Sequence, residues 1–244
     1  MSDHDTTQAS TKQHRSHQAS NQNGTQATAL QHPVNDDIEA WKVYWQAHGQ
    51  SWRTEPEISI ERQRELEKRL ASIPDVREEE LLYFKDIPLN RADIEWLLAT
   101  RKTDRIVIFT RDNEQRQRHE SLTLSGADLR HIDLSDLPLQ RVNLQGAHLE
   151  GAILQGAHLE EAVLTGVRLG GASLMKAHLQ GADLVYAHLE EADLIEAHLE
   201  GALCCRTFFD AATRLNDVVL GDEKHRSVSF VDVRWGDVNL TVVD

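Results

Sequence analysis

The chain has 244 residues, enough for one or two domains with a hydrophobic core, and 40% of them are hydrophobic. Its formal net charge of −14 argues against direct binding to nucleic acid or to an anionic membrane, although an acidic surface can attract basic partner proteins. The sequence begins without a signal-peptide pattern and has no apolar run of about 20 residues, so we expect a cytoplasmic protein that does not bind membranes.

Residues 1–35 are rich in Gln, Ser, Thr and Asn and contain almost no large apolar side chain. Such a segment cannot bury enough apolar surface to offset the entropy lost on ordering, so we predict a disordered tail. The tail contains His4, His14 and His17, which we expect to be solvated rather than to form a metal site.

Residues 36–119 are predicted to form a small helical subdomain with an exit strand. Capping side chains at Asp36 or Asp37, at Ser59 and at Asn90 indicate where three helices begin. Apolar residues spaced by three and four positions predict their inward faces, which comprise Ile38, Trp41 and Trp45, then Leu66, Leu70 and Ile73, then Ile94, Leu97 and Leu98.

A leucine recurs at every fifth position from Leu124 to Leu199, and a small or apolar residue lies two positions before each one. Five residues of an α-helix advance by about 500°, and a strand alternates faces, so neither places these leucines on one side. A chain that turns a corner every five residues places them all around one axis. The predicted core includes Leu129, Leu134, Leu144, Leu149, Leu154, Leu159, Leu164, Leu169, Leu174, Leu179, Leu184, Leu189, Leu194 and Leu199.

Several segments within the leucine repeat share one three-residue pattern. The sequence Ala-Asp-Leu occurs at 127–129, 182–184 and 192–194. These residues resemble the pentapeptide-repeat family, whose motif is Ala, then Asp or Asn, then Leu, then two variable residues. The resemblance covers residues 120–210 and implies a mainly β fold, a right-handed quadrilateral β-helix with four pentapeptides to a coil. The helical region before it resembles the front part of longer bacterial pentapeptide-repeat proteins.

Both ends of the repeat need a cover, because an open coil exposes unpaired backbone groups. At the start, the apolar run 106–109 predicts a strand that, with the helices, covers the first coil. The phase breaks after Phe209, so residues 211–244 are predicted to hold an excursion, extending over about 210–227, and then repeats shifted by one residue. These repeats are 228–230, 233–235 and 238–240. They either cap the end themselves or pair with a second copy as a homodimer.

The residue before each leucine points outward, and with four sides to a coil residues twenty apart stack on one face. The candidate interaction surface comprises His148, His158, His178, His188, His198, Glu150, Glu160, Glu190 and Glu200. We expect a polar stacking ladder. The alternatives are a metal site bridging two stacked imidazoles and a neighbouring glutamate, and a pH-responsive surface. Outward aliphatic residues lie on the other two faces, Ile153 and Met175 on one and Val163 and Leu203 on the other. They are either a second contact surface or side chains that only favour the β conformation.

The sequence contains no Ser-His-Asp or Cys-His arrangement, no phosphate-binding glycine loop and no acidic metal motif. The adjacent Cys204 and Cys205 predict no disulfide, and Cys204 continues the leucine phase as a core thiol. We therefore assign no catalytic residue, cofactor or metal, and expect a non-catalytic scaffold for an unidentified protein partner.

The family resemblance implies an alternative function, a DNA mimic that modulates a type II topoisomerase such as gyrase. Residues 121–205 contain twelve Asp and Glu but only four Lys and Arg, which favours this alternative. The shortness of the stack and the large helical region count against it.

Overall fold

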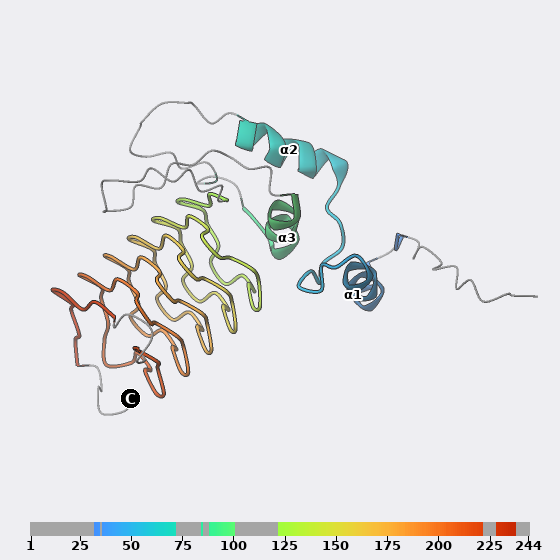
Figure 1. Ribbon diagram of the computed structural model, residues 1–244. Helices are drawn as coiled ribbons and strands as arrows, with labels where there is room; N and C mark the ends of the chain where they lie inside the picture. The colour runs from blue at the N-terminus through green and yellow to red at the C-terminus, as the bar shows by residue number, and fades with distance from the viewer. Residues whose placement is uncertain are drawn as a thin grey trace, which may run out of the picture. The chain divides into compact units, whose positions relative to one another are not determined.

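The computed structural model describes residues 32–34, 36–71, 84, 88–100, 122–221 and 228–237 (Figure 1). The helices are α1 (Ile38–Ala47), α2 (Ile60–Ala71) and α3 (Arg91–Thr100). The strand predicted at 106–109, the repeat predicted at 238–240 and nearly all of the predicted tail lie outside the described residues. None of the described helices has the length and apolar character needed to cross a bilayer.

The predicted caps begin all three helices. Asp37 Oδ1 accepts hydrogen bonds from the backbone N–H groups of Glu39 and Ala40, at 3.1 and 3.3 Å. Ser59 Oγ accepts one from the N–H of Arg62 at 3.2 Å. The cap of α3 is reciprocal: Asn90 Oδ1 accepts from the Asp93 N–H at 2.9 Å, and Asp93 Oδ2 accepts from the Asn90 N–H at 3.1 Å. Each side chain satisfies backbone donors that a helix start leaves without partners.

The predicted inward faces of the helices are confirmed with one exception among the described residues, and Ile73 lies outside those residues. Trp41 and Trp45 are buried and stack with ring centroids 5.2 Å apart. Ile38 was predicted to share this face, but it is 47% exposed. It is the first residue of α1, and helical side chains lean toward the N-terminus, so it points beyond the helix end. The predicted inward residues of α2 and α3 that the structure places in the core, fully or in part, are Leu66, Leu70, Ile94, Leu97 and Leu98.

Charged side chains are buried where α3 meets the loop after α1. Glu95 is fully buried, and its carboxylate accepts hydrogen bonds from the Thr54 N–H and hydroxyl and from the Glu55 N–H, at 2.9 to 3.0 Å. Arg91 Nε donates to the same carboxylate at 2.8 Å. On the neighbouring turn, Arg62 pairs with the buried Asp93 at 2.8 Å. Because every charge has an opposite partner and several hydrogen bonds, burial is tolerated here.

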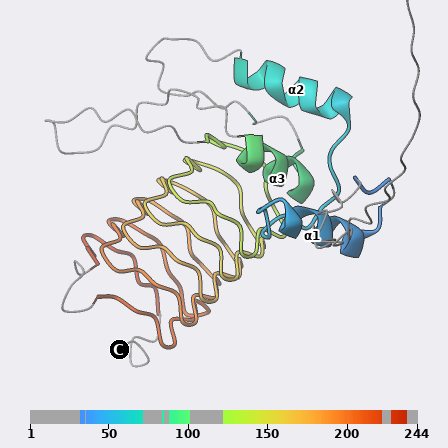
Figure 2. The same cartoon turned by 45° about the vertical axis from the view of Figure 1, so that its right-hand side comes forward.

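The repeat folds into coils of four five-residue sides. Parallel bridges join residues twenty apart without interruption from Thr123 and Asn143 to His188 and Phe208. Hydrogen bonds run in both directions between neighbouring coils, as where Leu154 N–H donates to the Ser173 carbonyl at 2.7 Å and Ser173 N–H donates to the Ala152 carbonyl at 2.9 Å. Figures 1 and 2 show the resulting stack of coils. The in-phase leucines lie inside it, each no more than 1% exposed, as predicted.

From Leu124 to Cys204, each corner of the stack places a residue in the left-handed backbone region. This residue lies two positions after the leucine or its equivalent, and its φ ranges from 55° to 72°. Glycine adopts this conformation without steric cost, which accounts for the corner glycines of the sequence. Other corners carry residues such as Lys176 and Glu196, which face each other in an ion pair of 3.4 Å.

The first coil contacts the helical region directly. Pro88 forms a parallel bridge with Asp128, and buried side chains of α3 belong to the same hydrophobic core as Leu124. Arg91 of α3 also donates to the backbone carbonyls of Asp133 and Ser135, both at 3.2 Å. The predicted contribution of the helices to covering this end is therefore present.

The stack continues farther than the sequence predicted. Arg214 forms a parallel backbone bridge with Asp193, and Val219 forms one with His198. Two further sides therefore follow Phe209, where an excursion was expected. The spacing becomes 21 because one residue is inserted. Asp210 absorbs the insertion, accepting hydrogen bonds from the N–H groups of Ala212 and Thr213. The side chain of an aspartate closes such a turn readily.

The last described coil confirms the out-of-phase repeats 228–230 and 233–235. Ser229 pairs with Leu203 and Arg234 with Phe208, at a spacing of 26 residues. One of the six additional residues is the insertion near Asp210, and the other five lie between Leu220 and Val228, where residues 222–227 are outside the described part of the chain. Trp235 stacks on Phe209 with ring centroids 5.1 Å apart and packs partly buried against the core.

Candidate functional site

Three outward histidines form a column on one face of the stack. The rings of His158 and His178 are 4.7 Å apart between centroids, those of His178 and His198 are 5.3 Å apart, and both pairs lie within 3° of parallel. Parallel bridges between the same residues fix this spacing. The predicted stacking of these three side chains is therefore a direct consequence of four five-residue sides to a coil.

Each histidine that precedes a Leu-Glu pair is bonded to that glutamate. Nδ1 of His158, His188 and His198 lies 3.0 to 3.1 Å from Oε1 of the glutamate two residues later. His148 and Glu150 are slightly farther apart, at 3.3 Å. The intervening leucine points inward, so the two polar side chains lie together on the outside. In the tautomer with a hydrogen on Nδ1, the imidazole donates this hydrogen bond to the carboxylate.

The middle of this column differs from its ends. His178 is followed by Gln180 rather than by a glutamate, so it lacks the carboxylate of its own side. Burial, together with the neighbouring His158 and His198, lowers the pKa of His178 below that of a free histidine. Its imidazole therefore stays neutral at neutral pH and takes up a proton only at lower pH.

The opposite face carries a different column. His148 and His188 are separated by the exposed Arg168, so no two histidines are adjacent. Beyond them, Phe208 stacks on His188 with centroids 4.4 Å apart and an interplanar angle of 1°. The guanidinium of Arg234 lies 5.0 Å from the Phe208 ring centroid, a distance that allows a cation–π contact. This face therefore combines arginine side chains with the aromatic rings of histidine and phenylalanine in one column.

Four outward side chains have a buried oxygen atom with no hydrogen-bond partner in the described protein. They are Glu150, Glu160, Gln180 and Glu200. Glu200 is the most enclosed of the three glutamates, with 9% of its side chain exposed. A buried carboxylate oxygen without a donor is costly unless water or an ion binds it. The sequence placed these side chains on the surface and gave no sign that one oxygen of each is enclosed.

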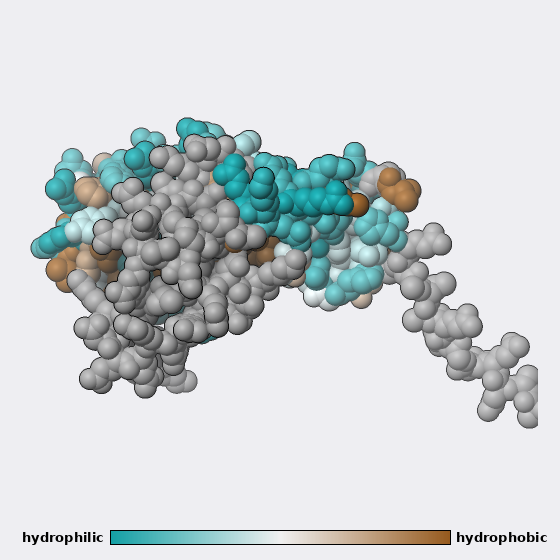
Figure 3. Space-filling model, turned by 90° about the horizontal axis from the view of Figure 1, so that it is seen from above, coloured by the Kyte–Doolittle hydropathy of each residue, from teal (hydrophilic) through white to brown (hydrophobic). Residues whose placement is uncertain are grey.

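The outward aliphatic residues differ in exposure, and Met175 is only partly exposed. Ile153 and Leu203 are 43% and 37% exposed, and Tyr186 is hydrogen-bonded to Arg206 through its hydroxyl. In the view of Figure 3 the coloured surface is mainly hydrophilic, with hydrophobic residues in small separate groups. Isolated apolar residues of this kind are common on protein surfaces, so this face gives weaker support for a contact surface than the histidine columns.

The two cysteines take different positions, as predicted. Cys204 is buried at a leucine position, and burial raises the pKa of its thiol to about 12. It is therefore a neutral core side chain at physiological pH, since only the thiolate is a good nucleophile. Cys205 is partly exposed, and both thiols are free.

Comparisons with known proteins agree on the repeat. A family model for pentapeptide repeats matches residues 143–181 and 172–203, with eight copies. A crystal structure of a pentapeptide repeat protein from Nostoc PCC 7120, alr5209, is 39% identical, covering 36% of this chain and 72% of that one, with a TM-score of 0.35. None of the curated proteins matches the chain.

Two further solved structures are more distant. The pentapeptide repeat protein Rfr23 from the cyanobacterium Cyanothece 51142 is 24% identical, covering 52% of this chain and 71% of that one, with a TM-score of 0.20. QnrB1, a plasmid-mediated fluoroquinolone resistance protein, is 16% identical, covering 50% of this chain and 72% of that one, with a TM-score of 0.28. Structural likeness this low carries no functional information.

Proposed function

We propose that this chain, which belongs to the pentapeptide-repeat family, is a non-catalytic protein–protein interaction scaffold built on a right-handed quadrilateral β-helix. The observation that supports this most is the ordered display of side chains on two opposite faces. One face carries the three-histidine column, and the other carries the column of His148, Arg168, His188 and Phe208. Both columns are held at strand spacing by backbone ladders.

A rigid display suits binding, because side chains that are already ordered lose little entropy when a partner docks. The histidines and glutamates are held by bonds to each other, and the coils beneath them by backbone hydrogen bonds. The acidic balance of residues 121–205 favours a partner with a basic surface. The helical region adds a second surface next to the first coil.

Affinity capture from a lysate of the source cell tests this proposal, using the full chain as bait. Two variants serve as matched baits: H158A–H178A–H198A on one face and H148A–H188A on the other. We expect the wild type to retain a protein that one variant loses and the other keeps, while thermal unfolding of all three stays similar. If both variants retain the same proteins as the wild type, neither column is the binding surface.

A DNA-mimic modulator of a type II topoisomerase is the second candidate, and the acidic balance of the repeat is the observation that favours it. Three of its carboxylates are held in ion pairs: Arg130 pairs with Asp128, Arg141 with Glu161 and Arg214 with Asp193. Mimicry requires a row of free negative charges, so the scaffold is the better supported of the two. Gyrase supercoiling assays with and without a fluoroquinolone would separate them, since a scaffold for another protein leaves supercoiling unchanged at micromolar protein.

A further inference from the structure

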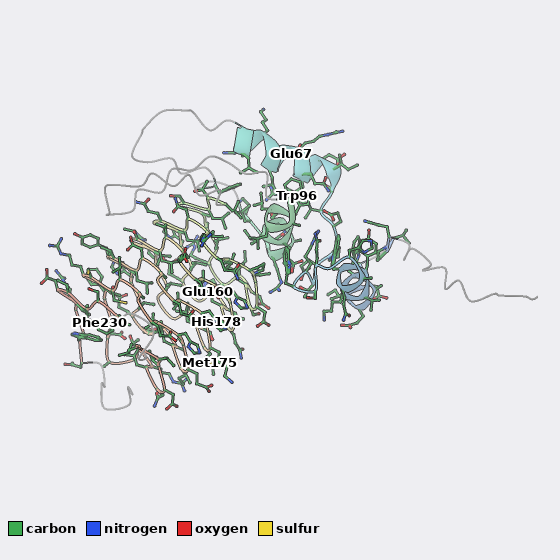
Figure 4. The ribbon with its side chains drawn as sticks, viewed as in Figure 1. Glu67, Trp96, Glu160, Met175, His178 and Phe230 are labelled. Atoms are coloured by element: carbon green, nitrogen blue, oxygen red, sulfur yellow. The ribbon has the colours of Figure 1, made fainter. Side chains whose placement is uncertain are left out.

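Three side chains of the histidine column lie close enough to share one ion. His158, Glu160 and His178 each offer a ligand atom, and these three atoms lie within 4.8 Å of one another. Figure 4 shows Glu160 and His178 next to each other on the repeat stack. All three residues are partly exposed, so an ion has access from solvent.

The donor set fits a divalent transition metal. Imidazole nitrogen with a carboxylate oxygen suits zinc, copper and nickel, whereas magnesium and calcium prefer oxygen ligands alone. The hydrogen bond between His158 Nδ1 and Glu160 Oε1 is 3.1 Å long, so a metal ion can take the place of the shared proton. The second oxygen of Glu160 is buried without a donor, which leaves the carboxylate less stabilised than a surface glutamate and favours a cation beside it.

We propose that His158, Glu160 and His178 form a surface site for a divalent transition-metal ion of the zinc class, with water completing the coordination. The site is independent of any protein partner, so it goes beyond the proposed scaffold function and can be tested on the isolated chain. An open site with three protein ligands and an exchangeable position would also let a histidine or carboxylate of a docked protein become the fourth ligand.

One movement is required for binding. The two imidazole rings are parallel within 3°, so their nitrogen lone pairs lie in separate parallel planes. A metal about 2.0–2.1 Å from both nitrogens needs one ring to turn about its Cβ–Cγ bond. That torsion is broad for histidine, and the His158 side chain is 42% exposed, so the ring has room to turn.

The rest of the column and the opposite face supply controls. His178 and His198 are stacked in the same way, but Gln180 stands where a glutamate would complete a second trio. On the opposite face Arg168 separates His148 from His188, so neither has a neighbouring histidine. His188 nevertheless keeps the same bond to a glutamate, at 3.1 Å, which makes it a matched control for the histidine–glutamate pair alone.

Isothermal titration of the untagged full chain with Zn²⁺ tests the site. H178A should bind Zn²⁺ at least ~10-fold more weakly than the wild type. Loss of a side chain that only hydrogen-bonds a metal ligand already costs this much, and loss of a ligand itself costs no less. H188A should bind as the wild type does. His4, His14 and His17 are present in every variant, so any zinc that they bind is common to all. Equal affinity in wild type and H178A, or an equal loss in H188A, would overturn the proposal.

A variant that moves the metal site one coil along the column separates loss of a ligand from loss of zinc affinity through misfolding. In H158A the site lacks one histidine, and adding Gln180→Glu supplies a carboxylate between His178 and His198. We expect the double variant H158A–Q180E to regain affinity to within about tenfold of wild type. Thermal unfolding without metal should be alike in all variants, since the substituted side chains are outside the core. Failure of the double variant to bind, while it unfolds as the wild type does, would contradict the assignment of this column.

Discussion

The repeat stack and the helical region bury different kinds of side chain. In the stack the core consists mainly of leucine and small apolar residues, and backbone hydrogen bonds join each coil to the next. In the helical region Asp93, Glu95 and Arg53 are buried, and each has specific side-chain partners. A pattern repeated many times therefore holds one part, whereas a few unique contacts hold the other.

The largest effect is expected for Glu95→Ala in the helical region. The substitution leaves Arg91 and the donors of Thr54 and Glu55 without their shared acceptor. We expect a loss of about 3–5 kcal/mol in the free energy of unfolding. Tryptophan fluorescence in urea measures it, because four of the five tryptophans lie in the helical region. The control Glu39→Ala removes an exposed ion pair with Lys42 and should cost less than about 0.5 kcal/mol.

Leu174→Ala tests the stack in the same way. Leu174 is fully buried midway along the repeat, and the backbone ladders above and below it limit collapse into the space left. We expect a loss of about 3 kcal/mol. Far-UV circular dichroism should report this loss more strongly than tryptophan fluorescence does. Equal shifts in both signals for both Leu174→Ala and Glu95→Ala would show that the two regions unfold as one unit.

Gly166→Ala probes the corners of the stack. Gly166 has φ of 63°, and a Cβ atom there would meet no other atom within 4 Å. The cost is therefore backbone strain alone, about 1–2 kcal/mol. Thermal unfolding should show a smaller drop than for Leu174→Ala. An unchanged or higher midpoint would mean that the corner backbone is not held in the left-handed region.

The smallest effect is expected at Asp128, on the outer surface. Hydrogen bonds from the Arg130 side chain hold the pKa of Asp128 at about 2, below the usual value. A lowered folded pKa gives stability above the unfolded pKa of about 3.9, and this stability is lost as pH falls through 2. Asp128→Asn should therefore destabilise by no more than about 0.5 kcal/mol at pH 7. The difference from wild type should shrink below pH 4, and a constant difference would contradict the pairing.

The stack was predictable from sequence because the five-residue repeat that defines it can be seen between neighbouring residues of the chain. Spacing of five fixes which side chains point inward, and the same rule places His158, His178 and His198 on one face. The rule fails where one residue is inserted at Asp210, because a strict five-residue phase cannot recognise a coil of 21. The continuation to Leu215 was therefore missed.

The buried charges of the helical region could not be predicted in the same way. Glu95 contacts Thr54 across 41 residues of sequence, and Arg62 contacts Asp93 across 31. Each of these residues is of a type usually found on the surface, so nothing local in the sequence distinguishes it. The enclosed oxygens of Glu160 and Glu200 were missed for a related reason, since burial of a single atom depends on packing between coils.

We propose that the outer columns carry the function and that the core of the stack carries only the stability. The most direct test measures the affinity of the captured partner for the H158A–H178A–H198A variant and for Leu174→Ala, at a temperature where both are folded. We expect the column variant to lose at least ~10-fold in affinity with an unchanged unfolding midpoint, and Leu174→Ala to bind as the wild type does despite a lower midpoint. Full affinity in the column variant, with loss in Leu174→Ala, would contradict the account.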